Sequence, residues 1–161
     1  MSDETVRMIK KMLSQKGVGF RHLTHDTIPT ASQKASMVRG TEHEKGAKAL
    51  IAKCSSGRVI QIVIPAHHRI NMKLLKQFLN EKNIMLISPD KVYELTDCVI
   101  GGVPPFGNLW NIDVVVANSL LDNEYIVCSG GTREDSFIIP SICVVKLNDA
   151  IVADISRSVS E

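Results

Sequence analysis

Hydrophobic residues recur along this chain with two different periods, one typical of helices and one typical of strands. In residues 4–16, Val6, Ile9, Met12 and Leu13 fall on one face of a helix, which Gly17 ends. Asn71 and the Ser88-Pro89 pair are typical first residues of two further helices. In all, the pattern predicts helices over residues 4–16, 30–39, 72–80, 88–96 and 141–148.

The strand-like segments are short, apolar and bounded by turn residues. The clearest are AKALIAKC (47–54) and RVIQIVIP (58–65), which are joined by Ser-Ser-Gly and predict a β-hairpin. Other strands are expected at 20–25, 84–87, 112–117, 124–129, 136–140 and 150–156. Because strands and helices do not alternate strictly, a simple doubly wound sheet is disfavoured. We expect one α/β (α+β-like) domain over residues 1–161, with a mixed, mostly antiparallel central sheet flanked by helices.

Composition narrows the functional classes. The chain has 161 residues, a net charge of +2 and only 4% aromatic residues. These values exclude a strongly basic coat protein for nucleic acid and disfavour an aromatic platform for stacked bases. No apolar run is long enough for a membrane span, and no secretory signal is present, so we expect a cytoplasmic protein that does not engage a membrane.

One basic stretch does stand out between residues 34 and 53. It is interrupted by Glu42 and Glu44, and it is either a solvated face or a contact surface for a phosphate backbone. Its cations are Lys34, Arg39, Lys45, Lys48 and Lys53.

Cysteine and histidine spacing gives no indication of a metal site. The four cysteines form no CxxC pair and lie in apolar runs, so they are expected to be small buried hydrophobes. The five histidines form no HxH or HxxxH pair, and no metal or organic cofactor is expected.

Two lysines flank the apolar centre of the strand predicted at 47–54. Because side chains alternate along a strand, Lys48 and Lys53 should point to opposite faces. Each is either an exposed lysine that discourages edge pairing, or a cation aimed at a carbonyl or phosphate in a cleft.

Two glycine-rich loops stand out, and the second of them follows a predicted strand. Residues 98–108, CVIGGVPPFGN, combine flexible glycines with two stiff prolines, and residues 129–135, SGGTRED, carry a Gly-Gly pair. Free N–H groups there could bind an oxyanion, although both loops could equally be rigid connections. Neither loop matches a P-loop, a GxGxxG sequence or a GxSxG nucleophile elbow.

Taken in order, RGTEHEKGAKALIAK, GGVPPFGN and SGG with a later DIS resemble the YbaK family. This family consists of free-standing aminoacyl-tRNA deacylases related to the editing domain of bacterial prolyl-tRNA synthetases. The resemblance covers roughly residues 20–156 and implies the fold of that editing domain. It implies trans-editing, that is, hydrolysis of the ester of a mischarged tRNA, such as a proline tRNA carrying cysteine or alanine. The implied partners are the aminoacylated 3′ end of tRNA and an aminoacyl-tRNA synthetase.

The resemblance also assigns roles to residues. Lys48, Gly101 and Gly102 are implied to be catalytic. The implied substrate-binding residues are Thr30, Val103, Pro104, Pro105, Phe106, Gly107, Asn108, Ser129, Gly130 and Gly131. Asn108 departs from relatives that carry a histidine here, and it cannot exchange a proton near neutral pH. A non-catalytic module that binds tRNA or a synthetase is therefore the alternative, and hydrolysis of a small free ester is a third reading.

Overall fold

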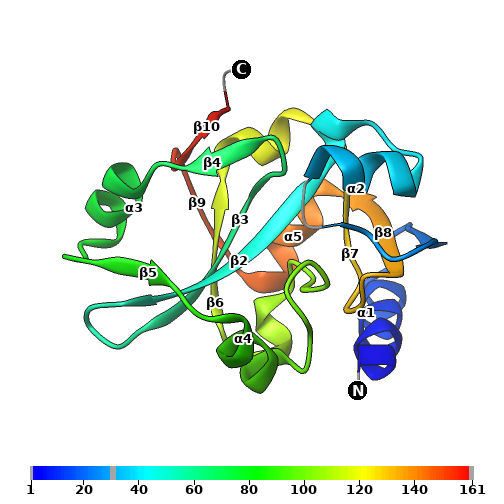
Figure 1. Ribbon diagram of the computed structural model, residues 1–161, viewed down its shortest axis with the longest axis horizontal. Helices are drawn as coiled ribbons and strands as arrows, with labels where there is room; N and C mark the ends of the chain where they lie inside the picture. Colours follow the sequence, from blue (N-terminus) through cyan, green and yellow to red (C-terminus); the bar gives the residue numbers. More distant parts are fainter. Residues whose placement is uncertain (1, 30–31, 160–161) are drawn as a thin grey trace.

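The computed structural model describes residues 2–29 and 32–159, and its largest sheet has five strands. Their order across the sheet is β5-β2-β3-β6-β9 (Figure 1). The β2–β3 hairpin forms as predicted, with β5 antiparallel to β2, whereas β6 and β9 extend the sheet in parallel. The strands are β2 (Ala47–Cys54), β3 (Val59–Pro65), β5 (Ile84–Leu86), β6 (Asp113–Ala117) and β9 (Ile151–Ala153).

Two smaller antiparallel sheets complete the strand structure. One has the order β1-β8-β7 and the other pairs β10 with β4. The expected mixed sheet is therefore present, and its parallel strand pairs are β3–β6 and β6–β9. The strands are β1 (Arg21–Thr24), β4 (His68–Ile70), β7 (Tyr125–Ser129), β8 (Asp135–Pro140) and β10 (Ser156–Ser158).

Two of the helices begin at the capping residues that the sequence marks. The side chains of Asn71 and Ser88 accept hydrogen bonds from the N–H groups of Leu74 and Lys91, so they cap α3 and α4 as predicted. The α-helices are α1 (Ser2–Gln15), α2 (Ser32–Arg39), α3 (Met72–Leu79), α4 (Pro89–Thr96) and α5 (Ser141–Asn148). None of the helices in the described ranges is long and apolar enough to cross a membrane.

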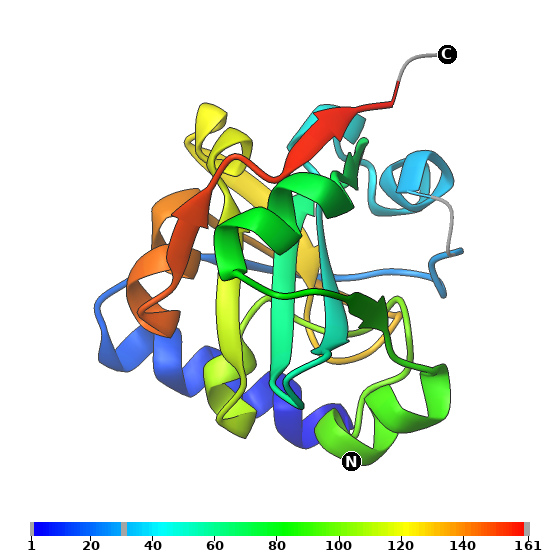
Figure 2. The same cartoon turned by 90° about the vertical axis from the view of Figure 1, so that its left-hand side faces the viewer.

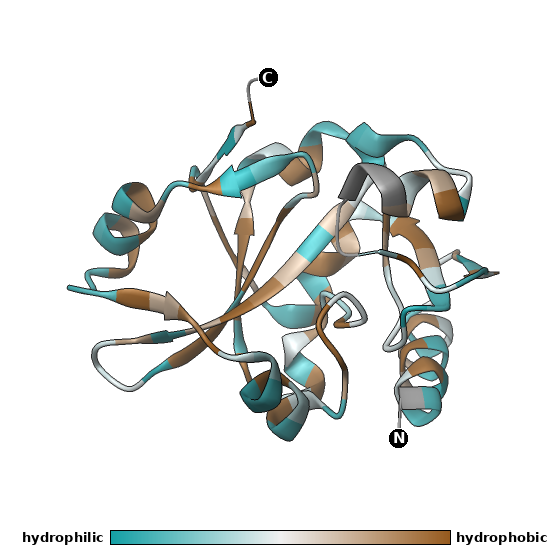
Figure 3. Ribbon diagram, viewed as in Figure 1, coloured by the Kyte–Doolittle hydropathy of each residue, from teal (hydrophilic) through white to brown (hydrophobic). Residues whose placement is uncertain are grey.

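Both faces of the five-stranded sheet are buried. Leu75 of α3 packs on one face against Ile62 and Ile64 of β3. On the other face, Val63 of β3 joins a cluster with residues of α1, α5, β7 and β8. Figure 2 shows α3 in front of the sheet with α1 below and behind it, and Figure 3 shows the apolar central strands between these layers.

The structure departs from the predicted elements in a few places. The segment expected as one strand at 150–156 divides into β9 and β10, which belong to different sheets. The strand β4 and three short 3-10 helices, η1 (His43–Lys45), η2 (Gly107–Trp110) and η3 (Asn118–Asp122), were not predicted. Such short elements carry too few residues to show a period.

Candidate active site

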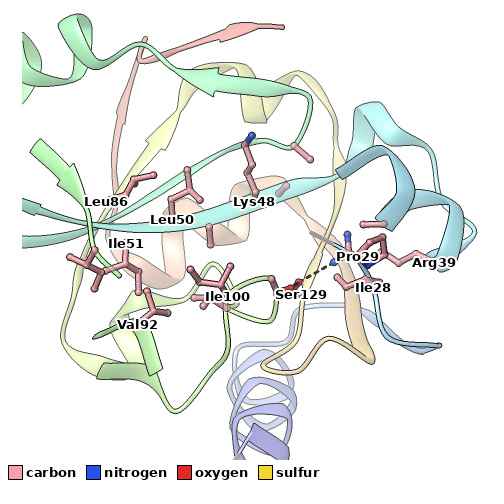
Figure 4. Close-up of a pocket in the computed structure, with 17 residues that line it drawn as sticks. Ile28, Pro29, Arg39, Lys48, Leu50, Ile51, Leu86, Val92, Ile100 and Ser129 are labelled. Atoms are coloured by element: carbon pink, nitrogen blue, oxygen red, sulfur yellow. Dashed lines mark hydrogen bonds between the residues drawn. The ribbon is translucent and has the colours of Figure 1, made fainter. Parts of the chain in front are cut away.

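A cavity of about 210 Å³ lies beside the N-terminal half of β2. Figure 4 shows its walls, which come from segments far apart in the sequence. Most of the lining is aliphatic, from residues such as Ile51, Val92 and Ile100. Four of the residues predicted for the site line it, namely Lys48, Gly101, Val103 and Ser129.

The cavity lies along the edge of β2 that faces away from β3, at a stretch where β5 does not pair with it. β5 pairs only with residues 52–54, and the next contact on this edge is the hydrogen bond from the Ile87 N–H to the Ile51 carbonyl, at 3.1 Å. Successive peptide groups of a strand point to alternate edges, so Ala49, like Ile51, directs its N–H and C=O away from β3. The cavity therefore has an open strand edge as one wall.

Lys48 extends from this strand toward the rim of the cavity. Its side chain is partly buried, whereas that of Lys53 is exposed, and the regular ladder with β3 places the two on opposite faces. Burial, and secondarily the charge of Arg69, lowers the pKa of the Lys48 ammonium. In Figure 4 the Lys48 side chain points away from Ser129 and Ile100. This geometry suits contact with a group at the rim better than contact with one at the cavity floor.

A hydrogen-bonded chain runs along the cavity wall opposite β5. Arg39 Nη2 donates to Ser129 Oγ at 3.0 Å, and Ser129 Oγ donates to the Gly101 carbonyl at 2.6 Å. Arg39 Nε donates to Ser136 Oγ at 2.7 Å. Burial lowers the pKa of the Arg39 guanidinium, and within residues 2–29 and 32–159 no carboxylate lies within ion-pair distance of it. Arg39 is therefore a partly buried cation that holds Ser129 and, through it, the loop at Gly101.

The two glycine loops are joined directly to each other. The Gly131 N–H donates to the Gly102 carbonyl at 2.8 Å, and the Gly102 N–H donates to the Val99 carbonyl at 2.9 Å. Gly101 and Gly131 have φ angles of +89° and +106°, which favour glycine. The Gly130 N–H is used by Asp135, so of these four glycines only Gly101 has an N–H with no partner in the described part of the chain. Among these four glycines, Gly101 is therefore the one whose N–H is free to bind an oxyanion.

The proline-rich part of the first loop is fixed from below by Gln61. This side chain of the central strand β3 is 0% exposed. Its Nε2 donates to the Pro104 carbonyl at 2.9 Å, and its Oε1 accepts from the Gly107 N–H at 2.8 Å. The stiffness of this loop therefore comes from a buried amide as well as from its two prolines.

The other predicted residues that the structure describes do not line the cavity. Phe106 is fully buried in the core, and the Pro105 carbonyl accepts a hydrogen bond from Asn148 Nδ2 at 2.8 Å. Asn108 is exposed and donates through Nδ2 to the Leu147 carbonyl at 3.1 Å, so it faces α5. Five further residues support the loops that carry the lining residues, namely Gly102, Pro104, Gly107, Gly130 and Gly131. Thr30 lies outside the described residues.

Sequence reasoning did not single out Arg39 or Gln61 for this site. Arg39 appeared only as one cation of a basic stretch. Gln61 was the one strong hint, because it is a polar residue inside the apolar run RVIQIVIP. A polar side chain in a buried strand needs a hydrogen-bond partner, and here that partner is the loop.

The cysteines and histidines occupy positions consistent with their sequence context. All four cysteines are free and buried, as predicted, and burial raises the pKa of Cys128 and Cys143 to about 12. The described residues contain no group of three or more His, Cys, Asp or Glu side chains placed to hold a metal ion.

A comparison with known families identifies the family of this chain. A family model described as "Aminoacyl-tRNA editing domain" matches residues 25–145, about three quarters of the chain. The chain belongs to this family. The match spans the cavity, both glycine loops and Gln61, and the activity of the family is hydrolysis of the ester in an aminoacyl-tRNA.

Individual relatives support this assignment. The "Multifunctional Ser/Thr-tRNA deacylase ProXp-y" of Escherichia coli (strain K12) is 28% identical over 151 residues, covering 91% of this chain and 90% of the relative. The crystal structure of the hypothetical protein APE2540 superposes with a TM-score of 0.83 at 27% identity, covering 92% of this chain and 99% of that one. A suspected trans-editing enzyme for prolyl tRNA synthetase has the same fold, with a TM-score of 0.79 at 23% identity and coverage of 96% and 98%.

Proposed function

We propose that this editing domain acts in trans and releases a small amino acid from a mischarged tRNA. The observation that carries the proposal is the cavity itself, which lies at the open edge of β2 and is lined by Lys48, Gly101 and Ser129. A bound aminoacyl ester would have an aliphatic recess for its amino-acid side chain and a backbone N–H donor at its carbonyl. It would also have a cation at the rim, where the rest of the tRNA extends out of the cavity.

The chemistry that we propose is attack of water on the ester carbonyl. The water oxygen bonds to the carbonyl carbon, the bond from that carbon to the ribose oxygen breaks, and the ribose oxygen takes up a proton. The products are a free amino acid and uncharged tRNA. The Gly101 N–H would stabilise the developing oxyanion, and the loop held by Gln61 and Ser129 would keep that donor in place with little reorganisation. The neighbouring ribose hydroxyl of the tRNA would help to orient the water.

The volume of the cavity supports specificity for an amino acid with a small side chain. About 210 Å³ must hold the amino acid together with the ester, and the walls Ile51, Val92 and Ile100 oppose larger groups. The relative from Escherichia coli is named for serine and threonine, so these two amino acids join cysteine and alanine as candidates. We expect that a synthetase which makes the mischarged tRNA, such as prolyl-tRNA synthetase, is the functional partner.

The deciding experiment is a panel of tRNAs charged with serine, threonine, alanine or cysteine, and with phenylalanine as the large control. Loss of the ester is followed with purified protein and with buffer. We expect faster loss for at least one small amino acid and none for phenylalanine. If no ester is lost faster than in buffer, the deacylase proposal is wrong. Tight tRNA binding in the same samples would then support the non-catalytic module.

A further inference from the structure

Two arginines stand directly opposite each other in the small sheet formed by β4 and β10. The register pairs Arg69 with Arg157, so the two side chains leave the same face of the sheet. Like charges at directly opposed positions destabilise a strand pair. Figure 3 shows β4 and β10 as a hydrophilic edge beside the apolar central strands. Because the opposed arginines do not stabilise the strand pair, we looked for a role of these two side chains in binding.

Few negative groups compensate this pair. Arg157 Nη1 contacts Asp154 Oδ1 at 2.5 Å, and this carboxylate is three residues away on an exposed turn. Arg69 is exposed and has no carboxylate within 4.0 Å in residues 2–29 and 32–159. Asp122 and Glu44 line a neighbouring recess together with His68, and the charge of Asp122 acts on that imidazole. Arg69 is therefore an exposed cation that faces Arg157 across the sheet and has no ion-pair partner among the described residues.

This surface continues into the rim of the cavity. Lys48 lies on β2, which pairs with β3, and β4 follows β3 after a short turn. Arg69 is close enough to Lys48 to act on its pKa, and in Figure 4 the Lys48 ammonium points toward β4. Lys48 also has no ion-pair partner among the described carboxylates. A row of cations therefore leads from Arg157 through Arg69 to Lys48.

We propose that Arg69 and Arg157 bind the phosphate backbone of the 3′-terminal strand of the substrate tRNA and lead it to Lys48. The inference rests on the proposed function for the identity of the RNA. Phosphate groups would neutralise the opposed arginines, which explains why the pair is kept despite its repulsion. The strand would then run along β4 and β10 and enter the cavity with its terminal ribose first.

The test measures binding of uncharged tRNA to the full chain over a range of salt concentrations. We expect Arg69→Gln and Arg157→Gln each to lower the slope of log Kd against log salt by about 1, the effect of one lost phosphate contact. Arg7→Gln on α1, at the opposite end of the molecule in Figure 1, makes the same charge change and should leave the slope unaltered. Arg69→Lys keeps the charge and should keep the slope.

Two further measurements separate this inference from a folding effect and from the proposed function. Arg69→Gln should keep or raise the melting temperature because it relieves a like-charged pair. A tRNA without its single-stranded 3′ end should show the smaller slope with the unmodified protein. If both glutamine variants bind with the unmodified slope, the inference is wrong even where deacylation is intact. If tRNA binds with the expected slopes but no ester is hydrolysed, the inference stands and the deacylase proposal fails.

Discussion

The Gly107 N–H donates a hydrogen bond to Gln61 Oε1 at 2.8 Å, although the two residues are 46 positions apart. Gln61 lies on the central strand, and its other amide atom holds the Pro104 carbonyl. One buried side chain thus supplies hydrogen-bond partners to two backbone groups of the loop, which would otherwise be buried without partners. The position of the loop, and with it the Gly101 N–H, depends on the core of the sheet.

We therefore expect Gln61→Leu to be costly. Leucine has a similar size but leaves a buried donor and a buried acceptor unpaired, at roughly 2–4 kcal/mol of unfolding free energy in total. The turnover number for ester hydrolysis should fall as well, because the loop loses its anchor. Urea denaturation and deacylation assays measure the two effects.

Gln77→Leu on the exposed face of α3 is the matched control, since it makes the same chemical change on the surface. It should change the unfolding free energy by no more than about 0.5 kcal/mol. Equal losses of stability in both variants would contradict the anchoring role of Gln61.

The elements of this fold could be predicted where their residues repeat over several turns or alternations. The hairpin at 47–65 and the helix caps Asn71 and Ser88 are local features, and the structure confirms them. The pairing of Gln61 with a loop more than forty residues later is not local, and neither is the bond from Arg39 to Ser129. A single sequence contains these residues but not the sheet order that brings them together. The family resemblance pointed to the two glycine loops, whereas the roles of Arg39 and Gln61 in holding them became visible only in the structure.

The second prediction concerns the two lysines of β2. We expect Lys48→Ala to lower kcat/KM about tenfold or more, which corresponds to about 1.4 kcal/mol of transition-state binding. Lys48 is at the cavity rim, whereas Lys53 is exposed beyond the segment that lines the cavity. Lys53→Ala should therefore have little effect on the same aminoacyl-tRNA. Similar losses in the two variants would show that the lysines act only through overall charge.

A third prediction tests the close packing of the second glycine loop. A Cβ at Gly130 would lie 2.6 Å from the Phe137 ring. That ring is fully buried and stacks on His22 with centroids 5.0 Å apart, so it has little room to move. Gly130→Ala should cost about 1–3 kcal/mol of unfolding free energy through overpacking. Gly19→Ala, where a Cβ meets no atom within 4 Å, is the control and should leave thermal unfolding almost unchanged.

The last prediction concerns pH and His68, a residue of β4 that is close enough to Lys48 to be affected by its charge. Burial, followed by the charges of His67, Lys48 and Arg157, lowers the pKa of this imidazole, while Asp122 opposes the shift. The unfolded chain therefore binds a proton at His68 more readily than the folded protein does. Stability should fall as the pH drops from about 6.5, the ordinary histidine value, through the lower folded pKa, and His68 should contribute no pH dependence above that range.

Urea denaturation between pH 5 and 8, run in parallel on the protein and on His68→Gln, measures this contribution. Glutamine cannot take up the proton but can still form a hydrogen bond with Ser156, the partner of His68 Nδ1 at 2.8 Å. The variant should lose less stability on acidification than the unmodified protein does. Identical pH profiles would mean that other groups cause the acid sensitivity. Because Lys48 and Arg157 add to the shift, bound tRNA phosphates should raise the pKa of His68 and reduce the difference between the two proteins.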